Sequence, residues 1–162
     1  MALFNNENIV TVGVGDLKVA RPPKVIKTSL GSCIGVVLYD SINKIGGMLH
    51  LMLPKRNSRD GKASKYADSG IPLLVDTMVN KGGANKRVLT AKIFGGAKMF
   101  SINSELFDIG KSNVAETKRI LDRMGIKIVA GKVGGTKGYQ IMLDTGTGIV
   151  QSKVFGGGLE KY

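Results

Sequence analysis

Cysteine and histidine each occur once in this sequence, tryptophan is absent, and no apolar run is long. A single cysteine cannot form an intrachain disulfide, and an unpaired thiol suits a reducing compartment. No stretch approaches the roughly 20 apolar residues that cross a bilayer. The first residues also lack the charged segment and following apolar run of a signal peptide. We therefore expect a cytoplasmic protein that does not insert directly into a membrane.

Acidic residues are scarce as well: 12 Asp and Glu stand against 24 Lys and Arg, which gives a formal net charge of +12. A field of this sign favours nucleic acid, an anionic membrane or an acidic protein surface as partner, and a solvated basic surface without a partner is equally compatible with it. Aromatic residues make up only 6% of the chain, and one cysteine cannot build a zinc finger. We therefore expect no nucleic-acid partner.

Short apolar runs separated by turn residues dominate the chain and predict a strand-rich protein. The length suits one domain over residues 1–162, and the 43% of apolar residues are enough for a core. The segments 33–39 and 45–53 are separated by a short turn and predict a hairpin. The predicted strands cover residues 9–14, 33–39, 45–53, 88–94, 126–133, 139–143 and 149–155.

Two segments have the spacing of amphipathic helices. The first covers residues 66–80, with Pro72 expected in its first turns because proline deeper in a helix costs about 3 kcal/mol. The second covers residues 113–124, where Asn113 and Glu116 have the spacing of a capping box. Strands outnumber helices and the helices come late, so the pattern favours an α+β fold over regular β-α-β alternation.

The single cysteine and the single histidine are the candidates for chemistry. Cys33 follows Gly31 and Ser32 at the entrance to a predicted strand, where a glycine turn can aim backbone N–H groups at an oxyanion. His50 lies late in the next strand, so a thiol–imidazole contact is geometrically reasonable. The spacing alone leaves other interpretations open: a small buried cysteine, a hydrogen-bonded core histidine, or two of the three or four ligands of a metal site.

Three glycine-rich segments offer a different possibility, namely phosphate binding. Residues 12–15, 94–97 and 155–158 could each expose backbone N–H groups to an anion. None matches a P-loop or the dinucleotide-binding G-x-G-x-x-G pattern, and turns or tight packing explain them better.

Five short motifs resemble, in order and spacing, the CheD family of chemoreceptor glutamine deamidases over about residues 9–154. The resemblance implies a layered α/β sandwich of mixed sheets with two main helices packed outside, similar to the catalytic domain of the cytotoxic necrotizing factor toxins. It also implies that Cys33 is the nucleophile and His50 the general acid/base, with no metal or organic cofactor. The motifs are Leu30-Gly-Ser-Cys33, His50-Leu-Met-Leu-Pro54, Lys65-Tyr-Ala-Asp68, Phe94-Gly-Gly-Ala-Lys-Met-Phe100 and Ile109-Gly-Lys-Ser-Asn113.

The resemblance implies an activity and two partners. The activity is conversion of particular glutamines in the cytoplasmic domains of methyl-accepting chemoreceptors to glutamate; some family members also hydrolyse glutamyl methyl esters. The second partner is a CheC-type phosphatase. A different hypothesis is a non-catalytic binding module that mainly activates this phosphatase. For the enzyme, we expect an imidazolium at His50 to stabilise the Cys33 thiolate, and N–H groups near Gly31 and Ser32 to hold the oxyanion.

Two departures from the family pattern affect the expected site. The supporting threonine of the family commonly lies six residues before the cysteine, where this chain has Lys27, and Thr28 follows it. A shift of one residue turns a strand side chain to the opposite face, so Thr28 as third catalytic residue requires a bulge. The motif Asp108-Ile-Gly-Lys-Ser-Asn113 also lacks the arginine that is common in the family.

A basic segment follows the predicted His50 strand. Receptor adaptation regions carry glutamates, so a cationic loop beside the site would steer them inward. An ordinary exposed loop remains an equally good interpretation. The residues expected to steer the substrate are Lys55, Arg56 and Arg59, with Lys62 and Lys65 further along.

Overall fold

The computed structural model describes residues 6–57, 61–99 and 108–162. Within these ranges, ten strands form two five-stranded sheets. The first sheet has the order β1 (Ile9–Thr11), β3 (Val25–Leu30), β8 (Tyr139–Asp144), β9 (Val150–Val154) and β10 (Leu159–Lys161). The second has the order β2 (Leu17–Ala20), β5 (Ile45–Leu51), β4 (Ile34–Asp40), β6 (Thr90–Gly95) and β7 (Lys127–Val133).

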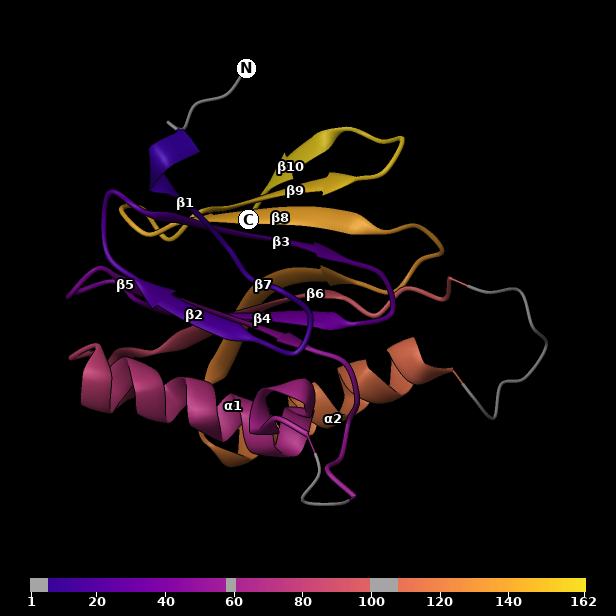
Figure 1. Cartoon of the computed structure of the whole chain (residues 1–162), viewed down its shortest axis with the longest axis horizontal. Coiled ribbons are helices and arrows are strands. Elements are labelled where there is room, and N and C mark those ends of the chain that lie inside the picture. The colour runs from indigo at the N-terminus through magenta and orange to yellow at the C-terminus, as the bar shows by residue number, and fades with distance from the viewer. Residues whose placement is uncertain (1–5, 58–60, 100–107) are drawn as a thin grey trace.

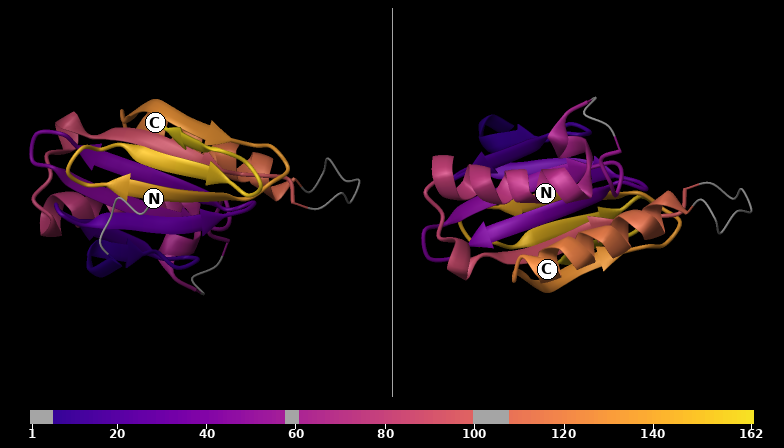
Figure 2. Two further views of the ribbon diagram at one scale, coloured as in Figure 1. Left: turned by 90° about the horizontal axis from the view of Figure 1, so that it is seen from above. Right: turned by 90° about the horizontal axis from the view of Figure 1, so that it is seen from below.

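Two helices, α1 (Ala67–Asp76) and α2 (Ile109–Arg123), cover the outer face of the second sheet, so the molecule has three layers (Figure 1). Figure 2 shows the same arrangement from both sides, with the first sheet on one face and the helices on the other. The layered α+β sandwich with two helices outside confirms the expected fold class. A π-helical turn, Thr77–Lys81, continues α1, and short 3₁₀ turns occupy Asn6–Asn8, Ala63–Lys65 and Lys86–Val88.

Both sheets are mixed. β1 runs parallel to β3 and β6 parallel to β7, whereas the other neighbouring strands are antiparallel. Parallel neighbours need a long crossover, and α2 lies in the one that joins β6 to β7. The fold therefore contains one β-α-β unit within a largely antiparallel architecture.

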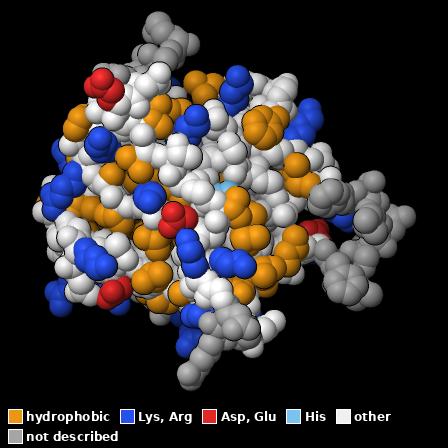
Figure 3. All heavy atoms as spheres, in the orientation of Figure 1, with side chains coloured by type: hydrophobic (Ala, Val, Ile, Leu, Met, Phe, Trp, Pro, Cys, Tyr) orange, Lys and Arg blue, Asp and Glu red, His pale blue; other side chains and the backbone are white. Residues whose placement is uncertain are grey.

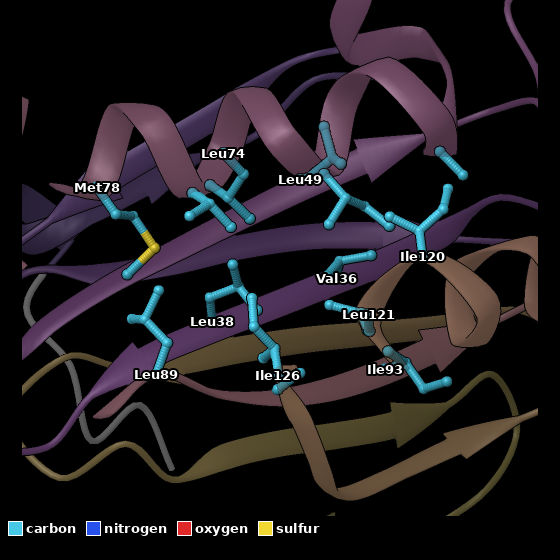
Figure 4. Close-up of a cluster of buried hydrophobic side chains, with 14 of the residues drawn as sticks. Val36, Leu38, Leu49, Leu74, Met78, Leu89, Ile93, Ile120, Leu121 and Ile126 are labelled. Carbon is cyan, nitrogen blue, oxygen red and sulfur yellow. The ribbon is translucent and has the colours of Figure 1, made fainter. Parts of the chain in front are cut away.

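The central hairpin of β4 and β5 is buried on both faces. Every residue of both strands is buried, because the first sheet covers one side and the helices cover the other. One apolar cluster lies between the second sheet and the helices, where Leu49 packs with Leu74 and Leu121 (Figure 4). A second cluster lies between the two sheets, and Cys33 packs against it. The predicted site thus lies at the edge of the inter-sheet core.

Sequence patterns located most elements, with errors at their ends. The hairpin is confirmed, although β4 begins at Ile34 and Cys33 precedes it. The strand expected over residues 9–14 is wrong in its second half, because β1 ends at Thr11. The predicted strands did not include β2, β3 or β10. Of these, the short strands β2 and β10 lie at the edge of a sheet, where little burial is available to impose an apolar pattern.

The start of α2 corrects a second expectation. The N-cap is Asp108, whose Oδ1 accepts a hydrogen bond from Lys111 N at 3.1 Å, so the helix begins four residues before Asn113. Asn113 and Glu116 are therefore interior residues and do not form a capping box. In α1, Pro72 is the sixth residue and lies in the second turn. In the described part of the chain, no helix combines the length and apolar character of a membrane span.

Candidate active site

Thr28 points into the space between the sheets, and β3 reaches this arrangement without a bulge. The register of β3 with β8 is regular from Val25 to Leu30. Thr28 is buried, whereas its neighbours Lys27 and Ser29 are half-buried and exposed. The requirement for a bulge was therefore wrong: the threonine faces inward at its own position, and the lysine faces away from the inter-sheet core.

The hydrogen bonds of Thr28 assign the tautomer of His50. Thr28 Oγ1 donates to Val12 O at 2.8 Å and lies 2.8 Å from His50 Nδ1. A hydroxyl has one proton, which the Val12 carbonyl takes, so Nδ1 must carry a proton and donate it to Thr28. In a neutral imidazole the other nitrogen, Nε2, is then unprotonated. His50 therefore presents a lone pair at Nε2, which is the state of a general base.

The backbone of His50 is fixed on both sides. Its N–H donates to Asp16 O at 3.0 Å, and its carbonyl accepts from Gly15 N at 2.8 Å. Across the hairpin, His50 pairs with Gly35 of β4. The glycine segment 12–15 thus supports the histidine strand, and the Gly15 N–H that phosphate binding would require is already used.

The hairpin register places Cys33 on the same face as His50. Cys33 immediately precedes β4 and comes two residues before Gly35, the partner of His50. Its side chain packs against the inter-sheet cluster, and His50 bonds Thr28 of the first sheet, so both side chains face the space between the sheets. Among the described residues, no hydrogen bond joins the Cys33 sulfur to His50. Nucleophile–base pairs are often longer in the absence of substrate.

Gly35 keeps the space beside this pair narrow. A Cβ at this position would lie 2.9 Å from both Ile141 Cδ1 and Leu30 Cδ1, so the side chains of the first sheet close over the glycine. His50 is only 2% exposed as a result. Figure 3 shows that the visible part of the one histidine (pale blue) borders hydrophobic side chains.

The turn that carries Cys33 is held by residues that follow β6. Gly96 N donates to Cys33 O at 2.9 Å, and Ala97 N donates to Gly31 O at 3.0 Å. A Cβ on Gly96 would lie 2.6 Å from Val114 Cγ2, so this glycine is needed where α2 closely approaches the loop. Close packing, and not an open phosphate cradle, accounts for the glycines of segment 94–97.

Burial affects both titrating groups of the pair. It raises the pKa of the Cys33 thiol, and a hydrogen bond from the cysteine's own backbone N–H offsets only part of this effect. It lowers the pKa of His50, since an imidazolium would lose its hydration. The environment therefore favours a neutral thiol and a neutral imidazole before attack, in contrast to the imidazolium expected from the sequence.

We expect acid to destabilise the protein through His50. The folded pKa lies below the unfolded value of about 6.5, so the unfolded chain binds a proton more readily. Above pH 6.5 the neutral histidine makes its full contribution to the free energy of unfolding. As pH falls from 6.5 toward the folded pKa, this contribution is lost by at most ~1.4 kcal/mol per pH unit. Urea unfolding of wild type and His50→Gln between pH 7.5 and 5 measures this loss. Equal pH dependence of the two proteins would contradict the prediction.

One residue of the site was missed by sequence analysis, where Asn113 was assigned to a helix cap. It lies inside α2, is fully buried, and donates from Nδ2 to Ser32 O at 3.1 Å and to Met52 O at 2.9 Å. The signal available in the sequence was its place at the end of the motif Ile109-Gly-Lys-Ser-Asn113.

The basic residues after β5 are only partly described. Lys55 is exposed, and Arg56 is half-buried, with its backbone N–H donating to both Asp68 carboxylate oxygens at 3.0 and 3.1 Å. Arg56 Nη2 donates to Gly61 O at 3.0 Å. Arg59 lies outside the described residues. In the parts of the chain that the structure describes, no three His, Cys, Asp or Glu side chains are grouped to hold a metal ion.

Comparison with known proteins shows which protein family this chain resembles. The family model described as CheD chemotactic sensory transduction matches residues 52–158. A protein of Desulforamulus reducens named probable chemoreceptor glutamine deamidase CheD is 44% identical over 165 residues, covering 99% of each chain. The Thermococcus kodakarensis protein of the same name is 45% identical over 148 residues, covering 89% of this chain and 91% of its own.

A solved structure, the hypothetical protein YfiH of Bacillus licheniformis, matches 76% of this chain and 58% of its own with 15% identity and a TM-score of 0.47. The family match covers the segment from the end of the His50 strand to β9, and the sequence relatives extend over nearly the whole chain. This chain belongs to the CheD family.

Proposed function

We propose that the protein is a glutamine deamidase of chemoreceptors that uses Cys33 as nucleophile and His50 as general acid/base. The observation that carries the proposal is the bond from His50 Nδ1 to Thr28, which leaves Nε2 free to accept a proton. The names of the curated relatives support the substrate class.

The reaction follows from the protonation states of the pair. Because burial favours the neutral thiol, His50 Nε2 must take the thiol proton as Cys33 Sγ attacks the carboxamide carbon of a glutamine. The carbonyl oxygen becomes an oxyanion that backbone N–H groups of the Gly31–Cys33 turn stabilise. His50 then returns the proton to the leaving nitrogen, so that ammonia departs and a thioester remains.

Hydrolysis of the thioester completes the cycle. His50 removes a proton from water, the resulting hydroxide adds to the thioester carbon, and the carbon–sulfur bond breaks. The proton returns to sulfur, and the product is a glutamate side chain. A glutamyl methyl ester would follow the same steps with methanol as leaving group, and we propose ester hydrolysis as a second activity of the site.

Thr28 is the proposed orienting residue. Thr28→Val keeps the branched shape but removes the acceptor for His50 Nδ1–H, so the imidazole loses both its tautomer and its orientation. We expect turnover to fall at least tenfold, an effect within the usual contribution of general acid–base catalysis. Deamidation kinetics measure this, with the outward-facing Ser29→Ala as matched control. A similar loss in both variants would assign the orienting role elsewhere.

The basic loop is proposed to attract the substrate. Lys55 and Arg56 follow the His50 strand directly, and acidic receptor helices would experience their field together with the +12 charge of the chain. Such steering raises the association rate and is screened over about 8 Å at physiological salt. A CheC-type phosphatase remains a proposed partner. The alternative of a binding module without catalysis predicts no product at any enzyme concentration.

The deciding experiment is incubation of the protein with cytoplasmic receptor fragments, followed by mass spectrometry. Deamidation replaces –NH₂ by –OH and adds roughly 1 Da at each modified glutamine, the net result of acyl transfer to water. Repetition at low and high salt tests steering, which requires kcat/KM to fall with salt while kcat stays constant. No mass change with folded protein would reject the enzymatic function and favour the binding module.

A further inference from the structure

Asn113 connects the two strands that carry the proposed nucleophile and base. Its Nδ2 bonds the carbonyl of Ser32, which precedes Cys33, and the carbonyl of Met52, which lies two residues after His50. Both partners are acceptors, so the amide nitrogen must face them. A flipped amide would place Oδ1 against the carbonyl oxygens of Ser32 and Met52, where no proton could join them. The Oδ1 atom is buried without a hydrogen-bond partner among the described residues, so these two bonds alone set the direction of the amide.

The bond to Ser32 O fixes a peptide whose other end is the Cys33 N–H. In a planar trans peptide the C=O and N–H bonds point in opposite directions. Since the carbonyl of Ser32 points toward α2, the N–H of Cys33 points away from the helix layer, toward the side where Cys33 packs against the inter-sheet core.

Three successive carbonyls of the turn are therefore held by other segments. Gly31 O accepts from Ala97 N, Ser32 O from Asn113 Nδ2, and Cys33 O from Gly96 N. Two of these donors are backbone groups that substitution leaves in place. Asn113 supplies the only one of the three that comes from a side chain, and it holds the middle peptide.

We propose that Asn113 is a positioning residue that aims the Cys33 N–H at the developing oxyanion. The inference rests on the proposed acyl transfer at Cys33 and adds a residue that acts through the Ser32–Cys33 peptide without touching the substrate. Without Asn113 the Ser32–Cys33 peptide loses the bond that fixes its carbonyl while its two neighbours stay held, and a tilt of this one peptide would misdirect the oxyanion donor. Loss of one such donor typically lowers turnover by about 10²–10³-fold.

The test compares two reactions of Cys33 that differ in their need for an oxyanion donor. Acylation by p-nitrophenyl acetate passes through a tetrahedral oxyanion, whereas alkylation by iodoacetamide displaces iodide at a saturated carbon and forms none. In Asn113→Ala we expect acylation of Cys33 to slow at least tenfold and alkylation to stay within twofold of wild type. A parallel reaction with Cys33→Ala gives the background from other nucleophiles.

A matched control comes from the same helix. Thr117 is also fully buried, one turn after Asn113, and its hydroxyl has no hydrogen-bond partner among the described residues. Thr117→Ala leaves a similar small cavity without touching the Ser32 peptide, so both reactions should keep their wild-type rates. If Asn113→Ala does not fold, Asn113→Leu fills the volume and still lacks the donor. We expect the same result for it, with acylation slowed at least tenfold and alkylation within twofold of wild type.

The outcomes separate this inference from the proposed function. Equal slowing of acylation and alkylation, or equal effects of the Asn113 and Thr117 variants, would assign Asn113 a purely structural role. Unchanged acylation would overturn the inference directly. Both reactions are independent of receptors. A wild-type protein that modifies no receptor glutamine would therefore reject the proposed function, while the slowing of acylation relative to alkylation in Asn113→Ala would still test the role of Asn113.

Discussion

Cys33→Ala is expected to reduce glutamine deamidation below about 1% of the wild-type rate while the protein remains folded. The sulfur is the only group at this position that can form the thioester, and without it His50 has no nucleophile to activate. The side chain is half-buried and packs at the edge of the inter-sheet core, so truncation by one atom removes little contact. We expect the cost in stability to stay below that of a large-to-small substitution in the core, which is ~2–5 kcal/mol.

His50→Ala should cause a comparable loss of activity by a different route. The thiol remains, but its raised pKa leaves little thiolate at neutral pH once the base is absent. Alkaline pH should therefore restore part of the reaction of Cys33 with iodoacetamide in His50→Ala and none in Cys33→Ala. Deamidation above 1% in either purified, folded variant would remove that residue from the proposed mechanism.

The candidate residues Cys33 and His50 were easier to find in the sequence than the contacts that hold them. Cys33 and His50 stand out because each residue type occurs once, and the hairpin between them follows from two apolar runs and a turn. The role of Thr28 was made conditional on a bulge, because the supporting threonine of the family lies one residue earlier, at the position of Lys27. The bulge is unnecessary: residues 31–33 lie outside both β3 and β4, so strand alternation does not continue from Thr28 to Cys33.

Asn113 could not be assigned from local rules. The capping-box pattern fits its sequence position, but Asp108 caps the helix five residues earlier, so Asn113 lies inside α2. Its two acceptors, Ser32 and Met52, are 81 and 61 residues away along the chain. Only the packing of α2 on the second sheet brings them together, and no pattern within the helix encodes that distance.

Glycines at the end of β6 and in the first turn of α2 explain how the helix and the Cys33 turn come so close. A Cβ on Gly110 would lie 2.5 Å from Gly96 O, and one on Gly95 would lie 2.2 Å from Cys33 O. The backbone of α2, the loop after β6 and the Cys33 turn are therefore in direct contact, with no side chain between them. The position of Cys33 depends on this contact as much as on the hairpin.

Gly95→Ala should consequently be one of the most damaging single substitutions in the chain. Gly95 has a φ of +99°, a conformation that L residues adopt at a cost of ~1–2 kcal/mol. The added Cβ would also collide with the Cys33 carbonyl, and overpacking of this kind costs a further ~1–3 kcal/mol. Movement of Gly95 is restricted because it pairs with Ile34 on one side and Val133 on the other.

Gly125→Ala provides the control that separates conformational strain from collision. Gly125 has a φ of +71°, and no atom lies within 4 Å of a Cβ built on it. We expect Gly125→Ala to lose only about 1–2 kcal/mol in urea unfolding and to keep its deamidation rate. Gly95→Ala should lose at least ~1 kcal/mol more and should be inactive even when folded, because the Cys33 carbonyl must rotate away from Gly96 N. Equal losses of stability with full activity in both variants would show that the Cys33 turn tolerates displacement, and the direct backbone contact would then not be what positions the nucleophile.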